Sequence, residues 1–417
     1  MESIHIQGGV ALQGKVLIQG SKNAALPILA ATLLTKETSC IHNCPRIADV
    51  YKMVSLLKSL GCSVNWEPDS IRVSAGQVCR GEMPVEAITG MRSSLCLLGA
   101  LIGRCGEVIM EYPGGCVIGE RPIDLHLEAL EKMGVCFSEE KGRLKAVARG
   151  LHGAAITLRK VSVGATENII LAAVMAEGNT TIYGAAREPE VVALCRYLED
   201  CGAGIEGIGT SSLFIEGGRK LYGTDFRIPA DRIVAGTYLI GCIGAGGNIL
   251  LEHAPWNQME AVIATAEQMG AQCTLTQEGI YVQAPDHILA LPLLQTAAYP
   301  GFPTDLQSAA LAVLTRSDGE CIIEENIFEN RFRVVEELLK MGADIEILNS
   351  HVVKIKGVEK LTAAAMEAKE LRGGAALILA GLMAEGESIV NGCSYIYRGY
   401  ENICKDLREL GARIVSV

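Results

Sequence analysis

Positive charge is scarce in this chain: 37 Lys and Arg stand against 48 Asp and Glu, giving a formal net charge of -11 over 417 residues. A protein that coats nucleic acid needs a basic surface, so that class is excluded. Aromatic residues make up only 5% of the chain although 49% is hydrophobic, so Ala, Leu, Ile and Val must fill the interior. This hydrophobic content excludes disorder as the main state, and the length favours two or more domains.

Long apolar runs are also missing. The longest, such as Ala375 to Met383, are interrupted by glycine and fall short of the roughly 20 residues that span a bilayer. Residues 1–7 have neither a basic start nor an apolar stretch, so we expect no signal peptide and no membrane partner.

The 15 cysteines form no Cys-x-x-Cys pair. This pattern favours free thiols in a reducing cytoplasm over a disulfide framework or a zinc site. The sequence also contains no metal-ligand cluster, dinucleotide fingerprint or P-loop, so we expect no metal and no organic cofactor.

A recurring helix ending organises the whole chain. A leucine, methionine or cysteine is followed by glycine and then by a strand-like run, at Gly61, Gly134, Gly202, Gly270, Gly342 and Gly411. Glycine adopts the left-handed conformation that lets the chain leave a helix and turn into a strand. A second series, of small-residue helices, interleaves with the first and is predicted to begin near Ser21, Arg92, Gly164, Asp231, Thr304 and Arg372.

Each of the six units thus combines a nearly apolar helix and an amphipathic helix with short strands. An apolar helix must be buried on all sides, so it should lie inside, covered by amphipathic helices and sheets. Six units suit two domains of three, with the break near 227–230. Because the last unit ends one hairpin short, the strand-like segment 3–19 is expected to join the second domain. We therefore predict an α/β protein with one domain over 21–229 and another over 1–20 plus 230–417.

Cations stand at four of the predicted starts of the small-residue helices: Lys22, Arg92, Arg232 and Arg372. A helix N-terminus is already the positive end of the helix dipole, so a further cation is unfavourable there unless an anion binds. If these helix ends converge, they form an anion receptor. The alternative is that each cation is solvated and paired with a nearby Asp or Glu.

The segment 112–124 is a predicted loop, because Pro and Gly are concentrated in it. Its Cys116 lies outside any helix or strand pattern, whereas Cys96 and Cys242 stand in apolar runs as packing cysteines do. Arg121 nearby would lower the pKa of the thiol. We interpret Cys116 as a presented, reactive thiol; an inert loop cysteine is the alternative.

Six motifs together resemble the enolpyruvyl transferases. They are Ser-Lys-Asn-Ala-Ala-Leu-Pro at 21–27, the Pro-Gly-Gly-Cys loop running into 121–124, Ser-Val-Gly-Ala-Thr at 162–166, Phe-Pro-Thr-Asp-Leu-Gln at 302–307, Phe-Glu-Asn-Arg-Phe at 328–332 and Arg-Gly-Tyr-Glu at 398–401. The resemblance covers the chain from end to end and favours the branch that uses UDP-N-acetylglucosamine, because the 3-phosphoshikimate branch lacks the cysteine loop. It implies two similar domains, each of three βαβαββ repeats around buried helices, an inside-out α/β barrel, with the active site in the cleft.

The resemblance also implies a reaction. The enolpyruvyl group of phosphoenolpyruvate passes to the 3′-hydroxyl of UDP-N-acetylglucosamine by addition and elimination, phosphate leaves, and peptidoglycan synthesis is committed. Both halves need an acid and a base around one carbon. The resemblance matches Cys116 to the acid, which can form an adduct with phosphoenolpyruvate and should be alkylated by phosphonate-epoxide inhibitors. It matches Asp305 to the base beside the acceptor hydroxyl.

Substrate contacts are implied in the same way. The catalytic cations Lys22 and Arg398 hold the anionic groups of phosphoenolpyruvate with Arg121, and Arg92 and Arg372 complete the cationic surround. The nucleotide-sugar contacts are Asn23, Arg121, Pro122, Ile123, Asp124, Leu125, Lys160, Val161, Ser162, Val163, Gly164 and Ile327. Glu188, Asp231 and Glu329 are assigned to ordering the site or its hinge.

Two places depart from the family pattern: Tyr397, where an acidic residue is common, and 167–168 (Glu-Asn), where less polar residues are frequent. Two other functions stay open, transfer to 3-phosphoshikimate and a non-catalytic paralogue that binds a nucleotide sugar. A cleft lined by cations should stay open when empty and close over the Cys116 loop when the UDP-sugar binds.

Overall fold

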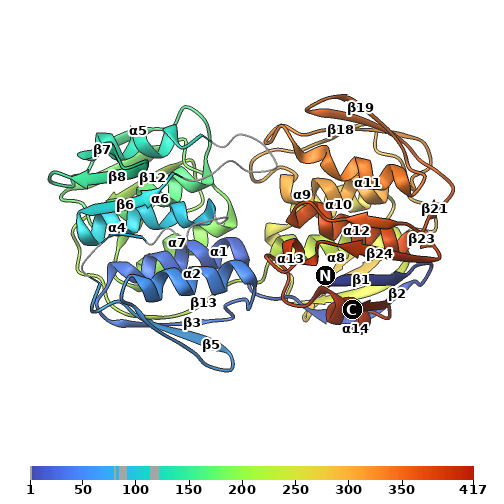
Figure 1. Ribbon diagram of the computed structural model, residues 1–417, viewed down its shortest axis with the longest axis horizontal. Helices are drawn as coiled ribbons and strands as arrows, with labels where there is room; N and C mark the ends of the chain where they lie inside the picture. The colour runs from blue at the N-terminus through green and yellow to red at the C-terminus, as the bar shows by residue number, and fades with distance from the viewer. Residues whose placement is uncertain (1, 79–80, 84–91, 113–121) are drawn as a thin grey trace. The chain divides into compact units, whose positions relative to one another are not determined.

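The chain forms two compact units, drawn as ribbons in Figure 1, and each has its own hydrophobic core. The computed structural model describes residues 2–78, 81–83, 92–112 and 122–417. One compact unit contains residues 2–19 together with 230–417, and the other contains the described residues between 20 and 229.

The described part of the unit within 20–229 has three small sheets around three buried helices. The strands of its sheets run in the orders β13-β3-β5-β4, β6-β8-β7 and β11-β12-β10-β9 in the described part of the chain. Their bounds are β3 (Thr38–His42), β4 (Ser63–Trp66), β5 (Ser70–Ser74), β6 (Glu107–Glu111), β7 (Val135–Glu140), β8 (Arg143–Ala148), β9 (Ala155–Thr157), β10 (Asn179–Tyr183), β11 (Gly204–Glu206), β12 (Ser212–Glu216) and β13 (Asp225–Arg227). The buried helices are α1 (Lys22–Ala31), α4 (Leu97–Cys105) and α6 (Val163–Ala173), and the amphipathic ones are α2 (Ala48–Ser59), α5 (Asp124–Lys132) and α7 (Pro189–Asp200). Short 3₁₀ turns are η1 (Thr32–Leu34) and η2 (Arg92–Cys96).

The other unit repeats this plan. Its four-stranded sheets have the orders β15-β16-β14-β2, β17-β18-β20-β19 and β22-β24-β1-β25, and β21 pairs with β23. The strands are β1 (Ser3–Gln7), β2 (Leu12–Leu17), β14 (Gly247–Glu252), β15 (Gln272–Leu275), β16 (Gly279–Gln283), β17 (Leu294–Gln295), β18 (Glu320–Glu324), β19 (Asp344–Asn349), β20 (Val352–Lys356), β21 (Leu361–Thr362), β22 (Ala365–Glu367), β23 (Ala384–Glu385), β24 (Glu387–Asn391) and β25 (Arg413–Ser416). The helices are α8 (Arg232–Ala245), α9 (Glu260–Gln268), α10 (Thr304–Leu314), α11 (Val335–Lys340), α12 (Leu371–Met383), α13 (Cys393–Ile396) and α14 (Ile403–Glu409), with 3₁₀ turns η3 (Trp256–Gln258) and η4 (Arg331–Val334).

The N-terminal strands belong to the sheets of this second unit. Strand β1 pairs antiparallel with β24 and with the last strand, β25, while β2 pairs parallel with β14. The first and last segments of the chain therefore complete one sheet.

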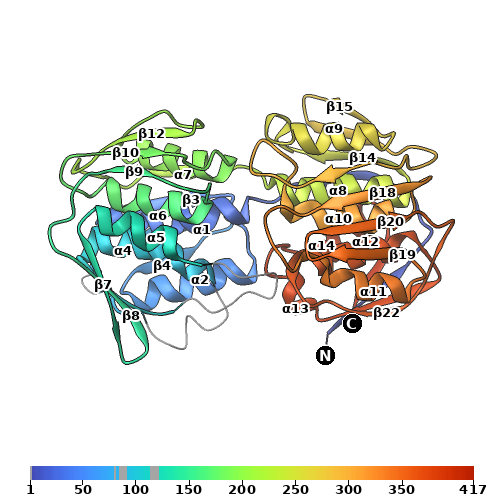
Figure 2. The same ribbon diagram turned by 90° about the horizontal axis from the view of Figure 1, so that it is seen from above.

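The small-residue helices are the interior of each unit, as predicted. Figures 1 and 2 show α8, α10 and α12 inside their unit, and all residues of α12 are buried. Close packing depends on glycine: a Cβ at Gly236 in α8 would lie 2.4 Å from Cδ1 of Leu306 in α10. In the other unit, a Cβ at Gly99 in α4 would lie 2.2 Å from the carbonyl oxygen of Asn168 in α6. The buried helices thus pack through glycine and alanine, which is consistent with the low aromatic content of the chain.

The predicted helix endings are confirmed. All six repeat glycines have positive φ, from 85° at Gly342 and Gly411 to 104° at Gly202. Each follows the last turn of an amphipathic helix, namely α2, α5, α7, α9, α11 or α14. The helix predicted to start near Arg92 is different, because a 3₁₀ turn begins there and α-helical geometry starts at Leu97.

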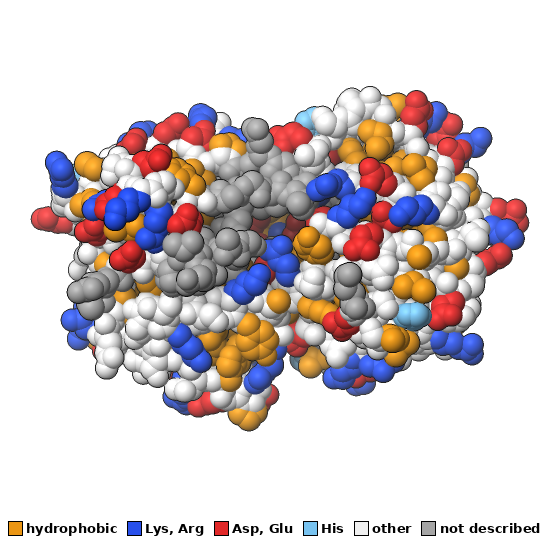
Figure 3. All heavy atoms as spheres, viewed as in Figure 1, with side chains coloured by type: hydrophobic (Ala, Val, Ile, Leu, Met, Phe, Trp, Pro, Cys, Tyr) orange, Lys and Arg blue, Asp and Glu red, His pale blue; other side chains and the backbone are white. Residues whose placement is uncertain are grey.

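Charged side chains of both signs are interspersed on the face of the molecule shown in Figure 3. Within the described part of the chain, no helix has both the length and the apolar character required to cross a bilayer.

Candidate active site

The structure does not describe the side chains of three predicted site residues. Cys116 and Arg121 lie outside the described residues. Arg92 is the first residue of η2, but its side chain is not among those described.

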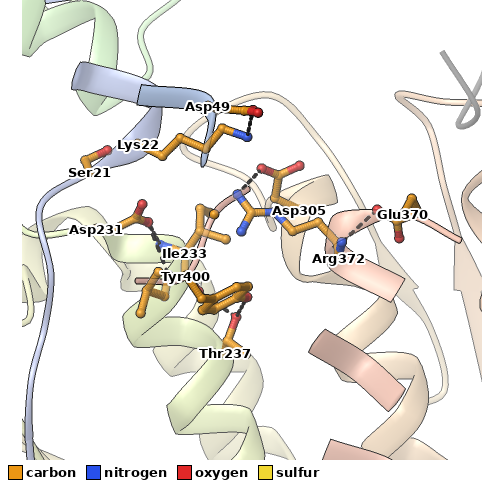
Figure 4. A network of polar contacts seen from close by, with 12 residues as sticks. Ser21, Lys22, Asp49, Asp231, Ile233, Thr237, Asp305, Glu370, Arg372 and Tyr400 are labelled. Carbon is orange, nitrogen blue, oxygen red and sulfur yellow. Dashed lines mark hydrogen bonds and ion pairs between the residues drawn. The ribbon is translucent and has the colours of Figure 1, made fainter. Parts of the chain in front are cut away.

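Lys22 is the first residue of α1, whose N-cap is Ser21. The Ser21 hydroxyl accepts a hydrogen bond from the backbone N–H of Ala24 at 3.3 Å. The ammonium of Lys22 lies 2.8 Å from a carboxylate oxygen of Asp49, whose side chain is only 1% exposed (Figure 4). Asp49 comes from α2, and no motif in the sequence marked it as the partner of Lys22. The cation at this helix start is thus paired with an acid, but the pair is buried and not solvated as the alternative to an anion receptor supposed.

The two segments predicted to hold the nucleotide sugar are brought together in one unit. Segment 122–125 leads into α5, segment 160–164 leads into α6, and Arg159 forms an ion pair with Asp124. Ser162 caps α6 by accepting from the N–H of Ala165 at 3.3 Å. Lys160 and Val161 are exposed beside this cap. The first turns of α5 and α6 therefore lie against each other, and helix N-termini favour anionic ligands.

His126 and Asn168 fix the contact between these helices. The amide nitrogen of Asn168 donates to Nδ1 of His126 at 3.1 Å and to the carbonyl oxygen of Gly164 at 3.1 Å. A Cβ at Gly164 would lie 3.1 Å from Cε1 of His126, so the helices approach closely there. The amide oxygen of Asn168 accepts from the N–H of Gly99 at 2.6 Å. The departure from the family pattern at 168 is thus a satisfied buried amide.

Glu167, the neighbouring departure, is a buried acid in α6. Burial raises the pKa of its carboxyl well above the usual range, and Glu190 and Glu188 nearby raise it further. Glu188 occupies the N-cap position of α7.

Asp305 is held between two buried arginines. It lies in the first turn of α10, and its two carboxylate oxygens accept from Nη2 of Arg331 at 2.7 Å and from Nη2 of Arg372 at 2.8 Å. Burial opposes ionisation, but the charges of Arg372 and Arg331 outweigh it and hold the pKa of Asp305 well below its usual range. Asp305 therefore carries a full negative charge at neutral pH. Arg331, in η4, was not predicted as a site residue.

The guanidinium groups keep unused donors. Among the described residues, the buried Nη1 of Arg372 and the buried Nε and Nη1 of Arg331 have no hydrogen-bond partner. Such buried donors are costly unless an acceptor binds. An anion beside Asp305 would satisfy them.

Arg372 is itself fixed from two directions. Glu370 caps α12 and accepts from the backbone N–H groups of Arg372, at 2.7 Å, and of Gly373 (Figure 4). The guanidinium lies 6.0 Å from the ring of Tyr400, whose hydroxyl is 2.8 Å from that of Thr237 in α8. The arginine is thus preorganised by the cap and by the aromatic ring.

Ile327 is tied to the helix that carries Asp305. Thr304, the first residue of α10, donates from its hydroxyl to the fully buried Glu325 at 2.9 Å. The other carboxylate oxygen of Glu325 accepts from the N–H of Ile327 at 2.8 Å. Glu325 was not predicted, whereas Glu329, which was, is exposed just before η4.

Arg398 follows α13 and is half-buried. Gln19 holds the loop after it: its amide nitrogen donates to the carbonyl of Gly399 at 3.1 Å, and its amide oxygen accepts from the N–H of Glu401 at 2.8 Å.

Asp231 caps α8 by accepting from the N–H of Ile233 at 2.8 Å, just before Arg232. Asp231 therefore caps a helix, whereas the sequence predicted only that it orders the site or its hinge.

One unit thus offers a fixed, ionised carboxylate between arginines with free donors, and the other offers a buried lysine and two adjacent helix N-termini. The carboxylate can accept a proton, and the cations and helix N-termini can bind anions. A family model described as EPSP synthase (3-phosphoshikimate 1-carboxyvinyltransferase) matches residues 6–407. The chain belongs to this enolpyruvyl transferase family.

Curated members of the family are similar over their full length. The "UDP-N-acetylglucosamine 1-carboxyvinyltransferase 2" of Caldanaerobacter subterraneus subsp. tengcongensis is 44% identical over 417 residues, covering 100% of both chains. The UDP-N-acetylglucosamine 1-carboxyvinyltransferase of Nitratidesulfovibrio vulgaris (strain DP4) is 44% identical over 414 residues, 99% of both.

Solved structures confirm the predicted fold class. The enolpyruvyl transferase NikO from Streptomyces tendae superposes with a TM-score of 0.88 at 22% identity, covering 100% of this chain and 99% of its own. An EPSP synthase from Acinetobacter baumannii gives a TM-score of 0.77 at 18% identity, covering 100% of both chains. At these identities the likeness concerns the fold alone.

Proposed function

We propose that this transferase moves the enolpyruvyl group of phosphoenolpyruvate onto the 3′-hydroxyl of UDP-N-acetylglucosamine and releases phosphate. The observation that carries the proposal is the 44% identity, over the full length of both chains, to enzymes named for that reaction. The family model is also shared with enzymes that use 3-phosphoshikimate, so it does not select the acceptor.

Asp305 is the proposed base for the acceptor hydroxyl. With two arginine partners its carboxylate is a weak base, and general bases work best with a pKa near the working pH. When the phosphate and carboxylate of phosphoenolpyruvate bind to the unused donors of Arg331 and Arg372, their negative charge offsets that of the arginines. The pKa of Asp305 then rises, so the base is activated by the arrival of the second substrate.

Cys116 is the proposed acid. Its proton adds to C3 of phosphoenolpyruvate while the sugar oxygen attacks C2 and the hydroxyl proton passes to Asp305. The resulting tetrahedral ketal loses a proton from C3 to the Cys116 thiolate, which restores the double bond as phosphate leaves C2, and the departing phosphate takes the proton held by Asp305. Lys22 and Arg398, with Arg121, Arg92 and Arg372, are proposed to neutralise the charge that develops on the departing phosphate.

The nucleotide sugar is proposed to bind over the N-termini of α5 and α6. Support comes from the ion pair that joins Asp124 to Arg159, from the Ser162 cap and from the exposed Lys160. A diphosphate suits such helix ends because unpaired backbone N–H groups and the helix dipole both favour anions. Asn23 and Ile327 are the remaining proposed contacts.

The proposed role in the cell is the committed step of peptidoglycan synthesis, and hence of cell-wall growth, cell shape and division. We place the enzyme in the cytoplasm, which fits the finding that every cysteine in the described part of the chain is a free thiol. Phosphonate-epoxide inhibitors are expected to alkylate Cys116.

A phosphate-release assay tests the proposal. Phosphoenolpyruvate is offered alone, with UDP-N-acetylglucosamine and with 3-phosphoshikimate, to the native enzyme and to Cys116→Ala. We expect phosphate only from native enzyme with the UDP-sugar. Release with 3-phosphoshikimate would establish the alternative acceptor, and absence of turnover with either acceptor would favour the non-catalytic paralogue.

A further inference from the structure

A cluster of three metal-ligating side chains lies on the β13-β3-β5-β4 sheet, and the proposed reaction does not use it. Cys40 and His42 are two residues apart on β3, so their side chains share one face of the sheet. Asp225 on β13 stands directly beside Cys40 in the parallel register. The sulfur, a ring nitrogen and a carboxylate oxygen of the three residues all lie within 4.8 Å of one another.

Two of the three separations between these atoms match a tetrahedral metal site. The sulfur of Cys40 is 3.6 Å from Nε2 of His42, and that nitrogen is 3.2 Å from Oδ1 of Asp225. Zinc bonds of about 2.3 Å to sulfur and about 2.0 Å to nitrogen and oxygen place tetrahedral ligands roughly 3.3 to 3.6 Å apart. Rotation of the Asp225 side chain, which is 78% exposed, can adjust the remaining separation.

We propose that Cys40, His42 and Asp225 form a Zn²⁺ site whose fourth position is open to water. Binding breaks the S–H bond of Cys40, releases that proton to solvent and forms a thiolate–zinc bond. The hydrogen bond between His42 and Asp225 is replaced by one bond from each to the metal. A thiolate with an imidazole selects zinc over magnesium or calcium, which prefer oxygen ligands alone.

The surrounding charges accommodate the cation. Arg72 on β5 stands opposite Cys40, and its Nε donates to Glu67 at 2.6 Å, so the guanidinium is already neutralised. With Cys40 as thiolate, three negative groups and one positive group surround the site, and a divalent cation balances them. The thiol is almost buried whereas Asp225 is exposed, so the ion enters from the Asp225 side.

The site would fasten an edge strand. β13 ends one of the sheet orders and pairs only with β3 among the described strands. A metal held by both strands stabilises the folded unit by RT ln(1 + [Zn²⁺]/Kd). Residues 225–227 are followed almost at once by the segment that leads into the other unit.

Titration of the full-length, metal-free protein with Co²⁺, followed by competition with Zn²⁺, tests the site without substrates. The native protein should show a thiolate-to-cobalt charge-transfer band that Zn²⁺ abolishes. Cys40→Ser and Asp225→Asn should each lose this band and weaken metal affinity by more than the ~10–100-fold that loss of a residue supporting a ligand costs. Asp225→Asn is included because the Asp225 side chain is exposed, so this substitution is not expected to disturb folding.

Cys136→Ser is the matched control, since Cys136 is an exposed cysteine on β7 of the same unit. It should bind like the native protein, and Cys116 is present in every variant, so its contribution cancels. The proposal fails if Cys40→Ser retains the band and the affinity of the native protein, because the thiolate signal then comes from elsewhere. It also fails if the native protein shows no such band.

Discussion

Asp305 is the single side chain on which the proposed chemistry depends most. Both of its oxygens are occupied by arginines, and each arginine keeps a buried donor unused. The carboxylate is therefore fixed in position but restrained as a base until an anion shares the arginines.

We expect Asp305→Asn to lower kcat by roughly 10²–10⁴-fold, the usual contribution of a positioned acid or base. Phosphate release with both substrates present measures this loss. Asp318→Asn is the control, because Asp318 is an exposed acid beyond the other end of α10 and should keep native activity. Equal activity of the two variants would remove Asp305 from the mechanism.

A half-buried acid makes the folded unit sensitive to pH. Burial raises the pKa of Asp406, on α14, to about 6, even though its carboxylate accepts from the hydroxyl of Tyr238 at 2.6 Å, which lowers the pKa. Because the folded value exceeds the unfolded value of about 3.9, the folded state binds the proton more tightly. Stability is then lost as the pH rises from about 4 to about 6.

Asp406→Asn keeps an acceptor for Tyr238 but removes the charge. The variant should exceed the native protein in free energy of unfolding by about 1–2 kcal/mol at pH 7, a figure reduced for partial exposure. The gain should vanish near pH 4, where native Asp406 is protonated. Denaturant unfolding at the two pH values measures it, and a gain that is independent of pH would contradict this reading.

The sequence predicts Lys22 and Asp305 as site residues from motifs and Arg372 from its place at a helix start, but it missed the residues that hold them. Asp49, Arg331 and Glu325 act across long separations in the chain, and no local pattern links an acid in one helix to a lysine in another. The same reason applies to the Cys40 cluster: Asp225 reaches Cys40 only through strand pairing, so ligand spacing in the sequence gave no metal signal.

The helix endings are the features that the sequence predicted best, because each needs a residue with positive φ and glycine adopts that conformation readily. Gly342 shows this most simply, since its φ is 85° and a Cβ there would meet nothing within 4 Å. Strand order and register depend on contacts between distant segments. The sequence therefore indicated the pairing of β1 with β25 only indirectly, because the last unit is one hairpin short.

Gly342→Ala should cost about 1–2 kcal/mol of stability, the penalty of a left-handed alanine, because no steric clash adds to it. Gly342→Asn should cost less, since asparagine tolerates this conformation. Denaturant unfolding of the two variants compares them. A native-like Gly342→Ala would mean that the left-handed turn is not required there.

The whole molecule consists of two units with separate cores, and we propose that they are the two domains of three repeats that the sequence predicts. Proposed substrate contacts come from both, with Lys22 in one and Asp305 in the other.

Binding of UDP-N-acetylglucosamine is expected to make the molecule more compact, because its negative charge relieves the repulsion among the Lys and Arg side chains proposed as substrate contacts. Small-angle scattering should show a smaller radius of gyration with the UDP-sugar than without it. 3-Phosphoshikimate is the control and should leave the radius unchanged. Identical radii in all three conditions would refute ligand-driven closure.

The transfer itself is tested most directly by mass spectrometry of the acceptor together with phosphate counting in one reaction. We predict that UDP-N-acetylglucosamine gains one enolpyruvyl group for each phosphate released, and that 3-phosphoshikimate stays unmodified under the same conditions. Phosphate release without modification of the UDP-sugar, or modification of 3-phosphoshikimate instead, would contradict the proposed function.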